Sequence, residues 1–159
     1  MDGLLAALGD TGIATFLRTS RIVYPLVNAA HILGIGLLVG TIAALDARVL
    51  GFARRVPLAD AARLLLPVTT AGLLLAVLAG AALFIVRPAA YAANPVFLVK
   101  LGLIALALAN AAWLRLGTDW AVALGGGAVA PRVRAGAALS LLLWVSALVA
   151  GRLVAFFGY

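Results

Sequence analysis

Apolar residues follow one another in four long runs along the chain, and short polar segments separate these runs. A helix needs roughly 20 apolar residues to span the hydrocarbon core of a bilayer, and each run reaches that length. Strands are not expected, because an open sheet would leave backbone groups unpaired in lipid. The pattern predicts four membrane-spanning helices, at about residues 22–45, 64–86, 96–116 and 135–157.

The residues between the runs agree with these boundaries. Arg87-Pro88 ends the second run, and Asn94-Pro95 opens the third with Asn94 as N-cap. Pro67 should lie near the start of its helix, where a missing N–H costs least. Because the connections are short, consecutive helices should pack antiparallel. The sequence therefore predicts an all-α fold, an integral membrane antiparallel four-helix bundle that forms a single domain over residues 1–159.

The segment before the first run does not resemble a signal peptide. It carries Asp2 and neither Lys nor Arg near its start, and no small-residue cleavage site follows an apolar stretch. Its apolar residues favour a short helix in the membrane interface, with a frayed terminus as the alternative. These residues are Leu4, Leu5, Leu8, Ile13, Phe16 and Leu17.

Composition supports lipid as the solvent of this chain. Hydrophobic residues make up 66% of it and charged residues 11%, whereas soluble domains are about half apolar and about a quarter charged. The lipid bilayer is therefore the expected partner. The net charge of +7 comes from Arg residues at the ends of the runs, a placement that favours membrane orientation over nucleic-acid binding. The absence of Cys excludes disulfides, thiolate metal sites and cysteine nucleophiles.

The Arg residues also predict an orientation. We call the end of the bundle that carries the N-terminus side A and the opposite end side B. Side B should be cytoplasmic because it has more Arg, which leaves both termini on the outer, periplasmic side. Side A carries Arg18, Arg21, Arg87 and Arg152; side B carries Arg48, Arg54, Arg55, Arg63, Arg115, Arg132 and Arg134.

Small residues recur at four-residue spacing on two of the runs. Gly36 and Gly40 form G-x-x-x-G on the first, and Gly72, Ala76 and Gly80 continue the same step on the second. Small residues let membrane helices approach closely. We expect these faces to pack within the chain, with a homo-oligomer face as the alternative.

Costly polar residues within the runs are candidates for a functional site. His31, Lys100 and Arg152 all lie in the half of the bundle near side A, with His31 roughly 13 Å from the end of its helix at 1.5 Å per residue. Tyr24 and Asn28 share a helix face with His31 by their spacing. If these side chains face inward, they form one cationic pocket.

Each cation also has a structural alternative. His31 could hydrogen-bond a neighbouring helix, and Lys100 and Arg152 could extend to the membrane surface. Asp46 and Arg48, at the end of the first helix, are expected to have structural roles and to pair with loops or with each other's neighbours.

Two further groups of residues have structural roles by prediction. Asn110 is expected to hydrogen-bond between helices. Aromatic residues near the helix ends fit interfacial belts, namely Tyr91, Trp113, Trp120, Phe156, Phe157 and Tyr159.

Motifs for common chemistries are missing from the sequence. It contains no Walker A loop, no H-E-x-x-H and no G-x-S-x-G. A lone His31 could supply one metal or haem ligand but not two, and Lys100 and Arg152 could then pair with haem propionates. An enzyme is left open, although the spans hold no mid-span carboxylate for acid–base work.

A set of residues along nearly the whole chain resembles a family of uncharacterised bacterial four-span membrane proteins. That family is distantly similar to copper-resistance D proteins and to haem-containing protoporphyrinogen oxidases. The resemblance implies a bacterial inner membrane location and points to His31 and Lys100; relatives often carry a second His where this chain has Trp113, which speaks against bis-His haem. The matching stretches are 24–34, 38–40, 45–51, 94–100, Asn110, 140–144 and 151–152.

Three functions follow as hypotheses. The first is a binding or redox module whose cationic pocket holds haem b or a small anionic ligand. The second is a structural or assembly subunit of a larger membrane complex. The third is an oligomeric transporter or channel, although no pair of broken helices is evident.

Overall fold

The computed structural model describes residues 2–157, which fold into eight helices without a strand. Four of the helices are long, and four are short pieces at the two ends of the bundle. The prediction for Tyr159 and that for the side chain of Phe157 lie outside the described residues. The helices are α1 (Asp2–Gly9), α2 (Gly12–Thr19), α3 (Val23–Leu50), α4 (Leu58–Phe84), α5 (Pro88–Ala93), α6 (Pro95–Arg115), α7 (Thr118–Leu124) and α8 (Pro131–Phe157).

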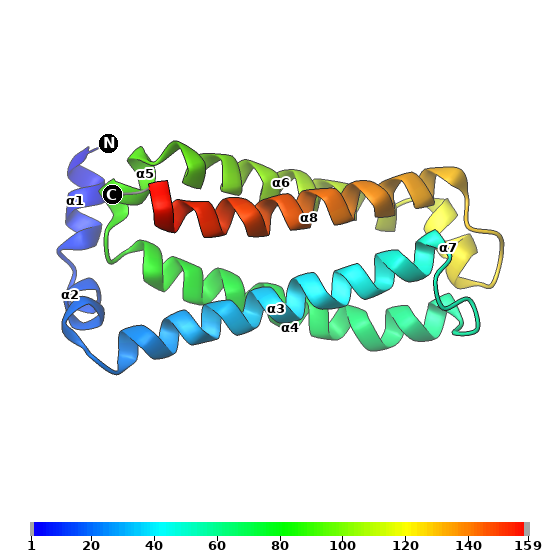
Figure 1. Ribbon diagram of the computed structural model, residues 1–159, viewed down its shortest axis with the longest axis horizontal. Helices are drawn as coiled ribbons and strands as arrows, with labels where there is room; N and C mark the ends of the chain where they lie inside the picture. The colour runs from blue at the N-terminus through cyan, green and yellow to red at the C-terminus, as the bar shows by residue number, and fades with distance from the viewer. Residues whose placement is uncertain (1, 158–159) are drawn as a thin grey trace.

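The long helices α3, α4, α6 and α8 run up and down along one axis, with the N- and C-termini at the same end (Figure 1). Each of the four is long and apolar enough to cross a membrane. The predicted all-α bundle of four spans is therefore confirmed, and the chain is a multi-pass membrane protein.

Three helices extend beyond the predicted spans at side B, among them α8, which begins at Pro131 rather than near residue 135. The helix α3 continues to Leu50 and α4 already begins at Leu58, so Pro67 lies inside α4 rather than near its start. The added turns are stabilised by packing, because Val49 and Leu58 belong to one buried apolar cluster. Tertiary contacts thus continue these helices past the end of the apolar run.

The start of α6 agrees with the prediction. The Asn94 side chain accepts hydrogen bonds from the backbone N–H groups of Val96 (2.9 Å) and Phe97 (3.2 Å), and Pro95 occupies the first turn. Asn110 further along α6 donates from Nδ2 to the carbonyl of Gly136 on α8 at 3.0 Å. The expected interhelical bond of Asn110 is confirmed.

The closest helix contact in the bundle is the crossing of α3 and α4. A Cβ added at Gly34 would lie 2.5 Å from the backbone N of Ala76 and 2.9 Å from the carbonyl O of Gly72. A Cβ added at Gly72 would lie 2.7 Å from the backbone N of Leu38. The small residues of α4 therefore pack within the chain, as expected.

The G-x-x-x-G pair of α3 does not take part in this contact. Gly36 and Gly40 are exposed, and a Cβ added at either would meet nothing within 4 Å. The prediction that these two residues pack within the chain is wrong. Gly34 makes the contact instead, because residues two positions apart point roughly 200° away from each other on a helix with 3.6 residues per turn.

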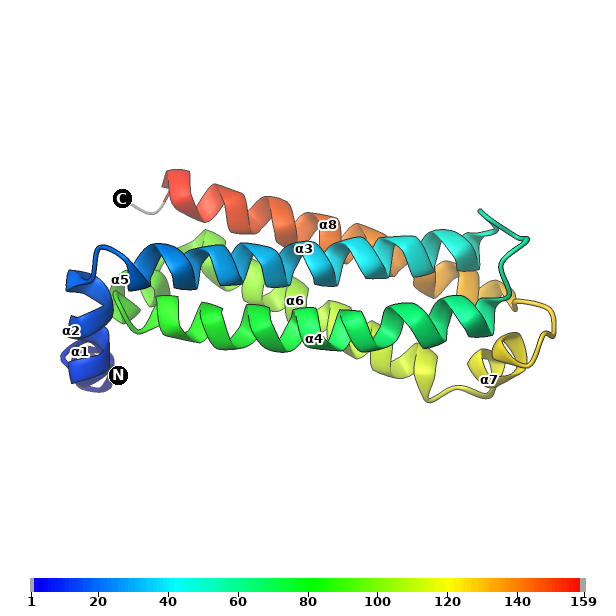
Figure 2. The ribbon, with the colours of Figure 1, turned by 90° about the horizontal axis from the view of Figure 1, so that it is seen from below.

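The bundle is built from two hairpins, α3–α4 and α6–α8, and α3 and α8 form the main contact between them. In Figures 1 and 2, α3 and α8 lie close together toward side B and diverge toward side A. Two buried apolar clusters follow this contact: Leu38 and Ile42 pack with Leu143 and Trp144, while Val133 and its neighbours pack nearer side B.

The segment before α3 is helical, as predicted, but it forms two helices rather than one. Thr11 breaks the segment and caps α2, accepting a hydrogen bond from the backbone N–H of Ala14 at 3.3 Å. Figure 2 shows α1 and α2 lying across the end of the bundle at side A. Leu17 of α2 is buried, whereas Ile13 and Phe16 are exposed, as expected of helices in a membrane interface.

Candidate functional site

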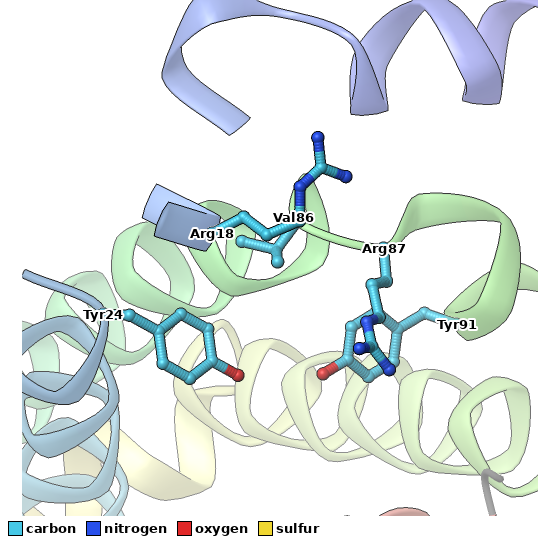
Figure 3. A pocket seen from close by; sticks show the side chains of 5 residues that line it. All are labelled: Arg18, Tyr24, Val86, Arg87 and Tyr91. Carbon is cyan, nitrogen blue, oxygen red and sulfur yellow. The ribbon is translucent and has the colours of Figure 1, made fainter. Parts of the chain in front are cut away.

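A pocket of about 230 Å³ opens at side A, where the short helices meet the spans. Arg18 of α2 and Tyr24 of α3 line it, together with Tyr91 of α5 and the linker residues Val86 and Arg87. Figure 3 shows the Tyr24 and Tyr91 hydroxyls pointing toward one another. The pocket thus combines two guanidinium groups with two phenol hydroxyls.

Local sequence explains how Tyr91 reaches this place. The helix α4 ends at Phe84, and Pro88 starts α5 in a new direction. The rings of Phe84 and Phe97 stack with centroids 5.7 Å apart, and the Tyr91 ring lies 5.3 Å from Phe97. Aromatic contacts of this kind hold α5 on the ends of α4 and α6.

The charges around the pocket favour an anion. Arg18 is exposed and forms no ion pair with a described residue. Asp10 lies at side A in the turn between α1 and α2 but does not line the pocket. The carboxylates of Asp60 and Asp119 lie at the other end of the bundle, where they pair with Arg63 and Arg132. Guanidinium groups bind carboxylate and phosphate oxygens through paired N–H donors, so this pocket can hold either kind of group.

His31 lies deeper in the bundle, on the face of α3 that meets α4. Its Nδ1 is 2.8 Å from the carbonyl O of Ala76. A Cβ added at Gly80 would lie 2.9 Å from His31 Cε1, so the missing side chain of Gly80 makes the space for the ring. Because a carbonyl only accepts, Nδ1 carries the proton, and Nε2 of the neutral ring has a lone pair available.

Lys100 comes from the other hairpin and lies near His31. Its ammonium is close enough to act electrostatically on the His31 ring. It also lies 5.6 Å from the centroid of the Phe97 ring, and the Lys100 stem packs on Gly151 of α8, with Cδ 3.7 Å from where a Cβ would be. His31 and Lys100 therefore lie on different hairpins, within the range of an electrostatic interaction.

The remaining candidates of the sequence lie elsewhere. Arg152 is exposed, and its guanidinium carbon is 4.9 Å from the centroid of the Phe156 ring on the same helix. Asn28 is also exposed, and Tyr24 belongs to the pocket with Arg18. The five candidates are thus divided between the pocket, the His31–Lys100 region and the bundle surface.

The fit of a haem can be judged from these positions. A His whose Nδ1–H is bonded to a backbone carbonyl is oriented as a metal ligand through Nε2. The ring is wedged between α3 and α4, however, and neither described pocket is lined by His31. The described residues also contain no group of three metal-ligating side chains. The residues do not fit haem b beyond a single nitrogen, and haem binding stays a prediction from the resemblance.

The predicted loop contact at the end of the first helix is present for Arg48 and absent for Asp46. Arg48 donates from Nε to the Val56 carbonyl at 2.6 Å, which confirms a loop contact. Asp46 does not pair with a loop: it is buried in the bundle, where the Ser140 side chain of α8 acts on it. The reason is that α3 continues to Leu50, which keeps Asp46 on the inward face of a helix.

The sequence predicts a site role for one pocket residue, Tyr24, and other roles for three of the rest. Arg18 and Arg87 were counted as orientation charges, and Tyr91 as part of an aromatic belt. Two features of the sequence could have indicated this pocket. Arg87 directly precedes Pro88, where a turn is expected, and the apolar segment before the first span ends near Arg18. Comparison with known proteins adds no further candidate: no family model matches the chain, and no curated protein or solved structure shows significant similarity to it.

Proposed function

We propose that this protein is a membrane-embedded binding module for an anionic group, phosphate or carboxylate, which it holds in the side-A pocket. The observation that carries the proposal is that Arg18, Arg87, Tyr24 and Tyr91 line one opening. His31 and Lys100 lie further into the bundle than the pocket. The positive charge of Lys100 would favour binding of an anion in the side-A half.

The size of the pocket narrows the ligand class. Sites for drug-sized ligands measure roughly 300–1,000 Å³, and this pocket of about 230 Å³ is smaller. It suits a lipid headgroup or a small free anion better than a macrocycle. Both sources share the same phosphate or carboxylate chemistry.

The proposal includes an orientation. The excess of Arg at side B supports a cytoplasmic location of that end, in the inner membrane of a bacterium. The pocket would then face the outer leaflet, and the two termini would be periplasmic. Anionic headgroups of that leaflet reach the pocket from the side of α1 and α2.

Replacing the two pocket cations tests this function. We expect Arg18→Gln with Arg87→Gln to weaken retention of phosphatidylglycerol at least tenfold, because each charge-assisted contact contributes about 1.5 kcal/mol or more and about 1.4 kcal/mol is tenfold in affinity. Native mass spectrometry of the protein from mixed phosphatidylglycerol and phosphatidylcholine micelles measures the retained lipid.

The matched control is Arg55→Gln with Arg134→Gln, which removes the same charge from exposed positions at side B. This control should change retention less than twofold. Titration of the wild-type protein with inorganic phosphate in phosphatidylcholine nanodiscs separates a free anion from a lipid headgroup. Equal loss in both double variants, or no preference for either anion over phosphatidylcholine, rejects the proposal.

A second function, an assembly subunit, is supported by one observation. Gly36 and Gly40 are exposed on the same face of α3 as Asn28, Ile32 and Ala44, all at four-residue steps. Exposed glycines at this spacing allow two membrane helices to pack closely, and an Asn in lipid gains a hydrogen bond when it meets a partner.

Self-association can be tested on this face directly. We expect Gly36→Leu to lower the dimer fraction at least fivefold in liposomes, because a side chain there would block close helix approach. Energy transfer between labelled copies at several lipid-to-protein ratios measures it. Gly102→Leu on α6 is the control, since Gly102 is also exposed with nothing within 4 Å. A wild-type protein that stays monomeric at every ratio excludes a homodimer through this face.

A further inference from the structure

The side-B half of the bundle encloses a carboxyl group that the proposed function does not use. Asp46 on α3 is 8% exposed, and Ser140 on the facing helix α8 is 5% exposed. One turn further along the same face of α8, Trp144 is 4% exposed. These three residues lie on α3 and α8, the helices that form the main contact between the two hairpins.

Two polar atoms of this group have no hydrogen-bond partner in the described part of the chain. They are Asp46 Oδ2, which is an acceptor when ionised, and Trp144 Nε1, which is a donor only. Each has essentially no accessible surface. A buried polar group without a partner costs about 1–3 kcal/mol, so two of them on facing helices call for a bound ligand.

The surroundings of Asp46 are apolar on both sides along α3. Ile42, one turn toward side A, packs with Leu38 and Trp144, and Val49, toward side B, packs with Val133. A ligand between such apolar neighbours must be small.

The cations at this end do not neutralise the carboxyl at short range. Arg115 of α6 acts on it electrostatically but is exposed and forms no ion pair with it. The other charged groups of the neighbouring elements are engaged elsewhere or exposed: Arg48 bonds Val56, Arg63 pairs with Asp60, Arg132 pairs with Asp119, and Arg134 is exposed.

The indole N–H of Trp144 is a donor and the Asp46 carboxylate is an acceptor, and together they restrict the kind of ligand that can bind between them. A metal cation would be repelled by the indole N–H, and an anion by the carboxyl group. A water molecule can accept from an indole N–H and bond a carboxyl oxygen at the same time, and buried waters typically have two to four such partners. A carboxyl buried without a counter-charge is expected to take up a proton rather than stay ionised.

We propose that Asp46, Ser140 and Trp144 form an internal proton-binding site, in which Asp46 is a neutral carboxylic acid bonded to a buried water that also accepts from the indole. Proton uptake forms the O–H bond at Asp46 and removes its negative charge; release returns the proton through the water. The site is separate from the anion pocket and does not depend on it.

Infrared spectroscopy of the protein in liposomes tests the site. The wild type should show the C=O stretching band of a protonated carboxylic acid at pH 5, shifted in D2O and weakening as the pH rises, and Asp46→Asn should lose it. Asp60→Asn is the matched control, because the Asp60 carboxylate is exposed and paired with Arg63. Absence of the band in the wild type, or its persistence in Asp46→Asn, overturns the proposal.

A second measurement on the wild-type protein guards against misfolding of the variant. The Trp144 indole N–H signal in NMR, assigned by its loss in Trp144→Phe, should show a cross-peak to water. It should also shift at the pH at which the infrared band changes. A Trp144 signal without a water cross-peak rejects the bridging water.

Discussion

Gly34→Ala is expected to lower the free energy of unfolding by about 3 kcal/mol or more, which is the largest effect of any single methyl group in this chain. Overpacking of a buried contact costs typically about 1–3 kcal/mol when side chains can move aside. Here the new Cβ would lie 2.5 Å from the backbone N of Ala76 and 2.9 Å from the carbonyl O of Gly72. Since backbone atoms cannot rotate away, α3 and α4 must separate.

The same substitution two residues later is the matched control. Gly36→Ala meets nothing within 4 Å, and Ala is favoured over Gly within a helix by about 0.5–1 kcal/mol. It should leave stability unchanged or raise it. Unfolding of both variants in detergent micelles by increasing SDS, followed by helical circular dichroism, measures the difference. If Gly34→Ala unfolds at the wild-type SDS fraction, the α3–α4 crossing is not as close as described.

The second large effect is expected at Gly80 and depends on His31. Gly80→Leu should lower the free energy of unfolding by about 2–4 kcal/mol, because it displaces the His31 ring and breaks its hydrogen bond to Ala76. His31→Ala removes the ring and leaves a space beside residue 80. In the His31→Ala background, Gly80→Leu should therefore cost less than about 1 kcal/mol.

This double-mutant cycle, measured by the same SDS unfolding, also bears on the role of His31. A coupling of about 1–3 kcal/mol between the two sites means that the ring acts as packing between α3 and α4. Gly102→Leu, at an exposed glycine of α6, controls for a leucine in a membrane helix and should show no coupling to His31→Ala. Additive costs at His31 and Gly80 would contradict the described position of the ring.

The spans could be predicted from the sequence, but the helix faces could not. Runs of apolar residues are long because lipid surrounds them, and this is visible in composition alone. The same apolarity removes the amphipathic pattern that shows which face of a soluble helix is buried. Gly34 and Gly36 therefore looked equivalent, although they point in opposite directions and only Gly34 meets α4.

The sequence was sufficient to predict where along the bundle the candidate site lies, but not which residues form it. Depth along the helices placed His31 and Lys100 in the same half of the bundle, and the structure brings them near each other. Arg152 shares that depth but turns to Phe156 on its own helix. The pocket residues Arg18 and Arg87 come from segments outside the spans, where α2 and the start of α5 set the geometry and apolar runs give no guidance.

The end of an apolar run does not predict correctly whether Asp46 is buried. The run ends near it, but α3 continues for another turn because Val49 packs with Leu58 and Val133. The carboxyl is thereby carried into the bundle instead of into a loop. Only the packing of residues distant in sequence decides this.

The division into two hairpins has a consequence for how the protein is made. The ribosome delivers the chain from its N-terminus, and parts that can fold alone generally do so first. The Gly34–Gly72 contact uses only residues of α3 and α4, so the first hairpin can assemble in the bilayer while α6 and α8 are still being synthesised. The two hairpins would then insert one after the other, and the contact between α3 and α8 would form last.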